Sequence, residues 1–231
     1  MLVYTFLHLQ YNGWFLLVAL GLFYQFLDSK RIPYNSKNAT LSYWLFSISV
    51  VPSIALSLLG MSFREYIMPL AYISAVMLGV GLFCFLRSIP SKISEYLRND
   101  NLWFRVFLMA FLVSFVLKTT LQCLSLLDIF RDYAFHNRFI IIAYMHLSLI
   151  GSISFLFIAL MIHNKWLKTN IWVQLGSILL LLGFIATEVL LTLTGLGLFY
   201  SGGMLVVGSA AMTLGILALT VKTNSNNELE A

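Results

Sequence analysis

Residues 171–193 read IWVQLGSILLLLGFIATEVLLTL, and Glu188 is the only acidic or basic side chain in that stretch. About 20 mainly apolar residues are enough for an α-helix to cross the hydrocarbon core of a bilayer. That core offers no water to backbone N–H and C=O groups, and a helix pairs those groups within itself. The stretch therefore predicts a transmembrane helix.

Similar apolar stretches recur along the whole chain of 231 residues. Hydrophobic residues make up 60% of it and charged residues 10%, whereas a soluble domain carries about 25% charged residues. We therefore predict an all-α fold: a polytopic integral membrane helix bundle with about seven transmembrane helices in a single transmembrane domain, residues 1–221. The predicted helices cover about 2–26, 41–59, 66–86, 102–126, 139–162, 171–193 and 203–221, and residues 222–231 form a short polar cytoplasmic tail.

The basic residues lie between the apolar stretches, so the formal charge of +5 indicates membrane topology rather than nucleic-acid binding. One side of the predicted bundle holds only Arg64, Arg131 and Arg138. Because short cytoplasmic loops are rich in Lys and Arg, we expect the N-terminus outside and the C-terminus in the cytoplasm. We expect a multi-pass protein of a cell membrane, taken as a bacterial inner membrane, with the lipid bilayer and other membrane subunits as partners. The basic residues of the expected cytoplasmic side are Lys30, Arg31, Lys37, Arg87, Lys92, Arg98, Lys165, Lys168 and Lys222.

Ionisable side chains inside a bilayer are costly and mark functional sites by default. The predicted helices contain His8, Lys118, His146 and Glu188. With a rise of about 1.5 Å per residue and the expected orientation, all four lie in the outer half of the bilayer. Each also has a purely structural explanation, in which a histidine bonds a neighbouring helix and Glu188 neutralises Lys118. The other members of the predicted polar layer are Asn12, Gln122 and Tyr144.

Two segments of the chain share the pattern H-L-x-x-x-G, one from His8 to Gly13 and the other from His146 to Gly151. They lie four predicted helices apart, which suggests a parallel repeat of four helices. Two neutral imidazoles from different helices at one depth can ligate a haem iron axially or hold copper. The pattern therefore predicts His8 and His146 as metal ligands and cofactor-binding residues, with haem b or copper as the cofactor.

Histidine-bearing helices that recur every four spans resemble the large subunit of the haem–copper oxidases and the related NnrS-type membrane proteins. The segments 8–14 and 143–147 are also similar to stretches of uncharacterised bacterial multi-spanning proteins of that kind. The resemblance implies a larger bundle of four-helix units, of which this chain is a part, and haem or copper binding by His8 and His146. The chain lacks an H-x-H and a His-Pro-Glu-Val-Tyr motif, so the resemblance does not extend to an oxygen-reducing centre.

Three functions stay open on the sequence alone. The first is a haem- or copper-binding protein with a redox, sensing or assembly role. The second is a transporter or proton-coupled permease, whose helices we expect to break near the site, with Pro52 and Pro69 as candidate positions. The third is a non-catalytic membrane scaffold. The apolar stretches contain no HExxH or GxSxG motif, which leaves no indication of an intramembrane hydrolase.

Overall fold

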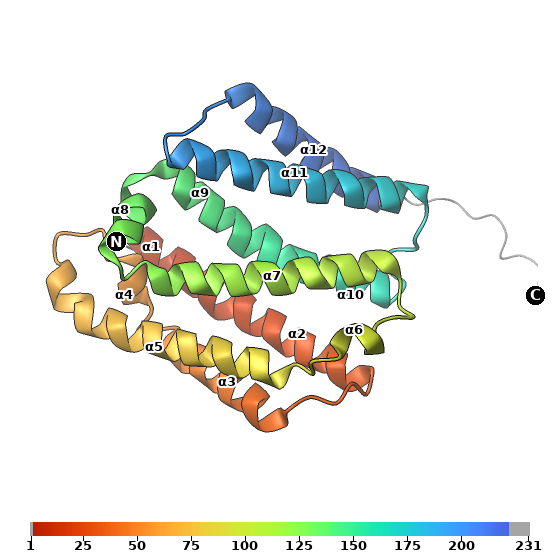
Figure 1. Cartoon of the computed structure of the whole chain (residues 1–231), viewed down its shortest axis with the longest axis horizontal. Helices are drawn as coiled ribbons and strands as arrows, with labels where there is room; N and C mark the ends of the chain where they lie inside the picture. Colours follow the sequence, from red (N-terminus) through yellow and green to blue (C-terminus); the bar gives the residue numbers. More distant parts are fainter. Residues whose placement is uncertain (1, 222–231) are drawn as a thin grey trace, which may run out of the picture. The chain divides into compact units, whose positions relative to one another are not determined.

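The computed structural model describes residues 2–221; the predicted polar tail, residues 222–231, lies outside the described residues. Most of the described residues lie in helices, and the described part of the chain contains no strand (Figure 1). The prediction of an all-α, multi-spanning membrane protein is confirmed, because six of the described helices are long and apolar enough to cross a bilayer. These candidate spans are Thr5–Ser29, Arg64–Ser88, Leu102–Leu124, Arg138–His163, Ile171–Gly195 and Gly202–Thr220.

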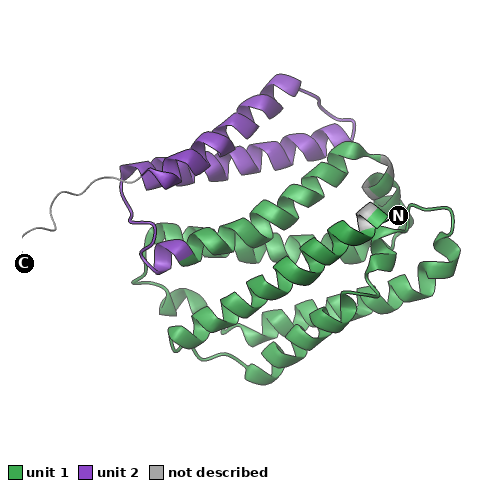
Figure 2. Cartoon of the chain, turned by 180° about the vertical axis from the view of Figure 1, so that it is seen from behind, with its two compact units in different colours: residues 1–160 green, residues 161–231 purple. Residues whose placement is uncertain are grey.

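The chain divides into two compact units, residues 1–160 and residues 161–231 (Figure 2). The single transmembrane domain predicted for residues 1–221 stays a prediction; the contacts within the chain separate it into these two units after Leu160. Unit 2 contains the helices α11, Ile171–Gly195, and α12, Gly202–Thr220. Unit 1 contains the remaining spans and the short helices that connect them, except for the last residues of the span Arg138–His163, which belong to unit 2.

Two of the spans in unit 1 change helix type in their middle. The first span runs through α1 (Leu2–His8), the π-helical segment η1 (Leu9–Phe15) and α2 (Leu16–Ser29). The span Arg138–His163 runs through α9, η2 and α10 in the same way. The pieces of this second composite span are α9 Arg138–His146, η2 Leu147–Ser154 and α10 Phe155–His163. The other helices of unit 1 are α3 Ser36–Ser49, α4 Ile54–Ser57, α5 Arg64–Ser88, α6 Ile93–Tyr96, α7 Leu102–Leu124 and α8 Asp128–His136.

Aromatic rings from several helices form the core of unit 1. The ring of Phe85 on α5 lies 5.6 Å from that of Phe23 on α2 and 4.8 Å from that of Phe115 on α7, measured between centroids. Phe46 on α3 packs against Phe115 at 5.5 Å. All four side chains are buried. Lipid is as apolar as these rings, so close packing rather than expulsion from water holds the helices together.

The predicted helix over 41–59 is wrong as a continuous span. Helix α3 ends at Ser49, residues 50–53 form a turn, and only the short α4 follows. Pro52 lies in that turn, and proline lacks the N–H that a helix interior needs and collides with the preceding turn. Pro69, the other predicted break, lies instead within the continuous α5.

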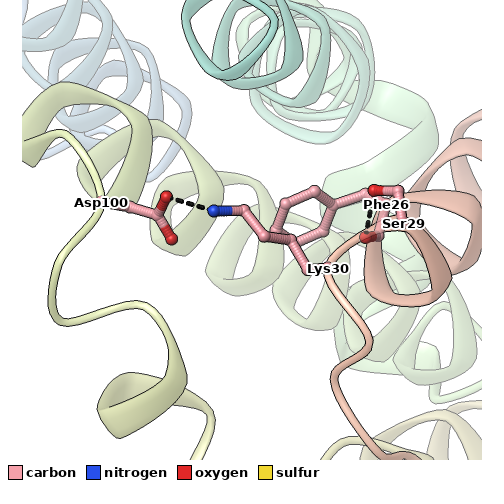
Figure 3. A network of polar contacts seen from close by, with 4 residues as sticks. All are labelled: Phe26, Ser29, Lys30 and Asp100. Atoms are coloured by element: carbon pink, nitrogen blue, oxygen red, sulfur yellow. Dashed lines mark hydrogen bonds and ion pairs between the residues drawn. The ribbon is translucent and has the colours of Figure 1, made fainter.

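An ion pair joins two connections at the end of unit 1 where α2 ends and α7 begins (Figure 3). The Nζ atom of Lys30 lies 2.5 Å from the Oδ1 atom of Asp100, and the side chain of Asp100 is only 15% exposed. The preceding turn is closed by the Ser29 hydroxyl, which donates to the Phe26 carbonyl at 2.8 Å. The pair therefore links two segments that are far apart in the sequence.

Glycines set the separation of the two helices of unit 2. A Cβ atom on Gly183 of α11 would lie 2.8 Å from the carbonyl oxygen of Gly208 on α12. A Cβ atom on Gly176 would lie 2.7 Å from the carbonyl oxygen of Gly215. Only hydrogen fits at such distances, so these residues allow the two backbones to approach as small residues do in membrane bundles.

Candidate functional site

His8, the last residue of α1, is buried, with 3% of its surface exposed. Its Nε2 atom lies 3.1 Å from the carbonyl oxygen of Val50 and 2.9 Å from the hydroxyl of Ser53, and its Nδ1 atom lies 2.7 Å from the hydroxyl of Ser57. A carbonyl oxygen can only accept a hydrogen bond, so Nε2 carries the proton and Nδ1 accepts from Ser57. The contacts of His8 are those of a neutral imidazole in the Nε2–H tautomer.

The Val50 carbonyl is one that the helix break sets free. In a continuous helix it would accept from the N–H of Ile54, but that N–H bonds the Val51 carbonyl at 3.1 Å. Val50 accepts instead from His8 and from the hydroxyl of Ser53 at 3.2 Å. A free backbone carbonyl is costly inside a bilayer, so His8 stabilises the break at this point.

Lys118 on α7 is the second buried ionisable side chain, with 2% of its surface exposed. Its Nζ atom donates hydrogen bonds to the side-chain oxygen of Asn12 and, at 3.0 Å, to that of Gln122. The amide nitrogen of Asn12 donates in turn to Nδ1 of His8 at 3.3 Å. The hydroxyl of Tyr144 on α9 donates to the Gln122 oxygen at 3.4 Å.

These bonds form one continuous chain from His8 through Asn12, Lys118 and Gln122 to Tyr144, which we call the polar network. Its members come from α1, η1, α7 and α9. The acceptors around Lys118 are neutral amide oxygens. The ion pairs found among the described residues of unit 1 are Lys30–Asp100, Lys92–Glu95 and Arg131–Asp128, and none includes Lys118.

The two H-L-x-x-x-G segments have the same unusual backbone. In each, the histidine ends an α-helix and the π-helical segment begins at the following leucine, which gives η1 after His8 and η2 after His146. The two π-helical segments also lie in contact with each other. π-Helical turns are rare and concentrate at functional sites. The sequence similarity thus corresponds to a structural one, while the four-helix repeat itself stays a prediction.

Gly13 within η1 explains how this helix approaches the break in the next one. A Cβ atom at this position would lie 3.1 Å from a methyl carbon of Val50. That separation is tighter than ordinary van der Waals contact, so a larger residue would push η1 away. The glycine of the first motif therefore helps to bring His8 within hydrogen-bonding distance of Val50.

The structure brings five of the predicted polar-layer residues together, namely the members of the polar network. His146 lies at the junction of α9 and η2, outside the bonds described above. Glu188 lies on α11 in unit 2, and its pairing with Lys118 stays a prediction. Ser53 and Ser57, which bond to His8, are not among the residues predicted from the sequence, although two serines beside a proline in an apolar stretch could have indicated polar partners there.

His8, as placed in this structure, does not fit the role of a metal ligand. A ligating imidazole needs one nitrogen lone pair directed at the metal, and the Nδ1 lone pair of His8 accepts from Ser57 while Nε2–H donates to Val50. Among the described residues there is also no group of three or more His, Cys, Asp or Glu side chains that could hold a metal ion.

No protein-family model, curated protein or solved structure matches this chain. The chemistry of the site therefore carries the functional argument. The polar network offers one buried amine, one neutral imidazole and two amides beside an interrupted helix. Such a set can hold and exchange a proton, because both amine and imidazole can gain or lose one.

Proposed function

We propose that this chain is a proton-coupled membrane transport protein in which Lys118 binds and releases the proton. The observation that carries the proposal is the surrounding of Lys118, which is buried among neutral amide oxygens with no carboxylate partner in the described part of unit 1. A lysine kept only as structure is normally paired with a carboxylate when it is buried. An ammonium held by neutral acceptors can lose its proton without leaving an opposite charge behind.

The interrupted helix beside the site supports the same function. Transport proteins commonly place their binding sites where a transmembrane helix is discontinuous, because freed backbone groups and a hinge then lie together. Here the break at residues 50–53 lies against His8, which is joined to Lys118 through Asn12. A change of protonation at Lys118 can therefore reach the hinge through three hydrogen bonds, Lys118–Asn12, Asn12–His8 and His8–Val50.

The direction of the proton path follows from the expected topology. With the N-terminus outside and the C-terminus in the cytoplasm of a cell membrane, His8 and Lys118 lie in the outer half of the bilayer. Lys118 then exchanges its proton with the outer solution in the resting state. The orientation is part of the proposal, and the distribution of basic loop residues supports it.

The binding of haem b or copper by His8 and His146 is the second candidate, and the shared π-helical geometry after both histidines favours it over a scaffold role. It requires His8 to give up its bond to Ser57 or to Val50. An optical spectrum and metal analysis of the purified protein separate the two candidates. A Soret band, or bound copper, that is lost in His8→Ala would favour the cofactor over proton exchange.

Electrical measurement of proton binding tests the proposed function without knowledge of the transported solute. The protein is reconstituted into liposomes adsorbed on a solid-supported membrane, and the outer solution is switched rapidly to lower pH. Proton entry to Lys118 crosses part of the membrane field, so the wild type is expected to give a transient current. The current should be absent in Lys118→Met.

Two variants make the outcome specific. Lys118→Arg keeps a positive charge but cannot lose its proton, so it should fold and still give no current. Lys92→Gln removes an exposed basic residue from a connecting segment and should leave the current unchanged. A wild-type current equal to that of protein-free liposomes, or a full current in Lys118→Arg, would overturn the proposal.

A further inference from the structure

A groove on unit 1 follows η1 and α2 and is closed on one side by α3. It has a volume of about 400 Å³. Leu17, Val18 and Leu22 line it, with Trp14 at one end and Gln25 at the other. Both Trp14 and Gln25 are exposed. The groove therefore opens on the outer surface of the unit, on spans that lie within the bilayer.

The length of the groove is that of one lipid leaflet. From Trp14 to Gln25 the helix rises roughly 16 Å at its usual pitch, and half of the hydrocarbon core measures about 15 Å. Gly21 lies on the exposed face between these ends, and a Cβ atom there would meet no other atom within 4 Å. The open space at Gly21 leaves room for a lipid acyl chain that lies along the helix.

Two polar side chains line the groove, and one of them, Gln25, lies toward the connection between α2 and α3. Gln25 and Tyr43 both line it, and an amide and a phenol are hydrogen-bond donors that hydrocarbon cannot satisfy. Gln25 is four residues from Ser29, the end of α2, and so lies about 6 Å inside that end. Phospholipid ester groups, which accept hydrogen bonds, occur near this depth.

Charges of both signs follow immediately beyond Gln25. Asp28 lies three residues further along α2, on the same helix face, and Arg31 begins the connection to α3. Both residues are exposed, and the ion pairs found among the described residues include neither of them. The Asp28 carboxylate accepts a hydrogen bond from the Tyr34 hydroxyl and keeps further acceptor positions for an ammonium group. The neighbouring Lys30 is bonded to Asp100. A headgroup that carries an ammonium and a phosphate complements this pair of charges.

We propose that this groove is a binding site for a phospholipid with a primary-ammonium headgroup, phosphatidylethanolamine. One acyl chain lies along Gly21 toward Trp14, and the ester region bonds Gln25 and Tyr43. The ammonium group donates to Asp28 and the phosphate accepts from Arg31. This lipid site is separate from the polar network and does not depend on the proposed transport function.

Quenching of Trp14 fluorescence by brominated lipids tests the site. A variant that keeps Trp14 as its only tryptophan is reconstituted into phosphatidylcholine bilayers with a fixed fraction of a lipid brominated on its acyl chains. Brominated phosphatidylethanolamine is expected to quench Trp14 more than brominated phosphatidylcholine, whose quaternary ammonium donates no hydrogen bond to Asp28. Asp28→Asn should abolish that difference, and Arg31→Gln should weaken quenching by both lipids.

Matched variants test whether a change in Trp14 quenching comes from the groove itself rather than from a general change in how the protein contacts the bilayer. Gly21→Phe fills the groove and should reduce quenching by every brominated lipid, whereas Gly79→Phe adds the same ring at another exposed glycine with no atom within 4 Å and should not. Glu95→Gln removes a carboxylate away from the groove and should keep the lipid preference. Equal quenching by the two lipids in the protein with Asp28 intact, or strongest quenching by brominated phosphatidylglycerol, would overturn the proposal.

Discussion

Lys118 donates a hydrogen bond to the side-chain oxygen of Asn12, a residue 106 positions earlier in the chain. The bond joins α7 to the π-helical segment η1 in the interior of unit 1. Asn12 also donates to His8, so one amide connects the buried amine to the histidine at the helix break. The stability of the unit and its proposed proton exchange therefore depend on the same side chain.

Removal of the Asn12 amide is expected to destabilise the protein. Asn12→Ala leaves Lys118 with one acceptor fewer in a buried position, which costs about 1–3 kcal/mol. Thermal unfolding in detergent micelles measures the change, with Asn99→Ala in an exposed connection as the control. The double variant Asn12→Leu with Lys118→Met should lose less stability than the sum of its single changes. Strict additivity would show that the two side chains do not interact.

His8 should contribute more to stability than the serine bonded to it. His8→Ala removes one of the two hydrogen-bond donors to the Val50 carbonyl, which should lower the free energy of unfolding by about 1–3 kcal/mol. Ser57→Ala should have a smaller effect, because Nδ1 of His8 still accepts from Asn12. Ser47→Ala removes an exposed hydroxyl that bonds only within α3 and serves as the control. The same thermal unfolding measurement checks this order, and a larger loss for Ser57→Ala than for His8→Ala would contradict it.

Two glycine-to-alanine substitutions in unit 2 should have very different effects on stability. Gly183→Ala places a methyl group 2.8 Å from the Gly208 carbonyl oxygen and should force α11 and α12 apart, at about 1–3 kcal/mol. Gly203→Ala, near the start of α12, meets no atom within 4 Å and should be neutral or slightly stabilising. Disulfide cross-linking between cysteines introduced on α11 and α12 reports the separation. Equal cross-linking in both variants would count against the close packing.

The expected topology can be tested with small substitutions at exposed serines. In a background without Cys84 and Cys123, Ser62→Cys should react with a membrane-impermeant maleimide added to intact cells. Ser91→Cys, in the basic connection between α5 and α6, should react only after the membrane is permeabilised. The reverse pattern would place the N-terminus in the cytoplasm.

The ion pair between Lys30 and Asp100 should contribute little. Lys30 is 31% exposed, and such pairs are worth about 0–1 kcal/mol and weaken with salt. Lys30→Met should therefore lower the unfolding temperature less than Asn12→Ala, and the difference from wild type should shrink at high salt. A loss as large as that of Asn12→Ala would show that this pair holds the two connections together.

The sequence by itself determined that the chain is a helical membrane protein, because apolar stretches of sufficient length have one stable backbone in lipid. It also indicated which side chains were out of place there, including His8 and Lys118, since an ionisable group in such a stretch is visible without coordinates. The tertiary structure decided which of them meet. Helix rotation and packing bring Asn12 between His8 and Lys118, and neither can be calculated from the spacing of residues along one helix.

The helix break after Ser49 also separates what the sequence indicates from what only the tertiary structure decides. Pro52 marked the apolar stretch 41–59 as unusual, but Pro69 marked α5 equally and left it continuous. At the break after Ser49 the freed Val50 carbonyl accepts a hydrogen bond from His8, a residue of another helix. The π-helical turns after His8 and His146 were also invisible in the repeated motif, because a change of backbone hydrogen bonding is stabilised by neighbouring helices rather than by residue type alone.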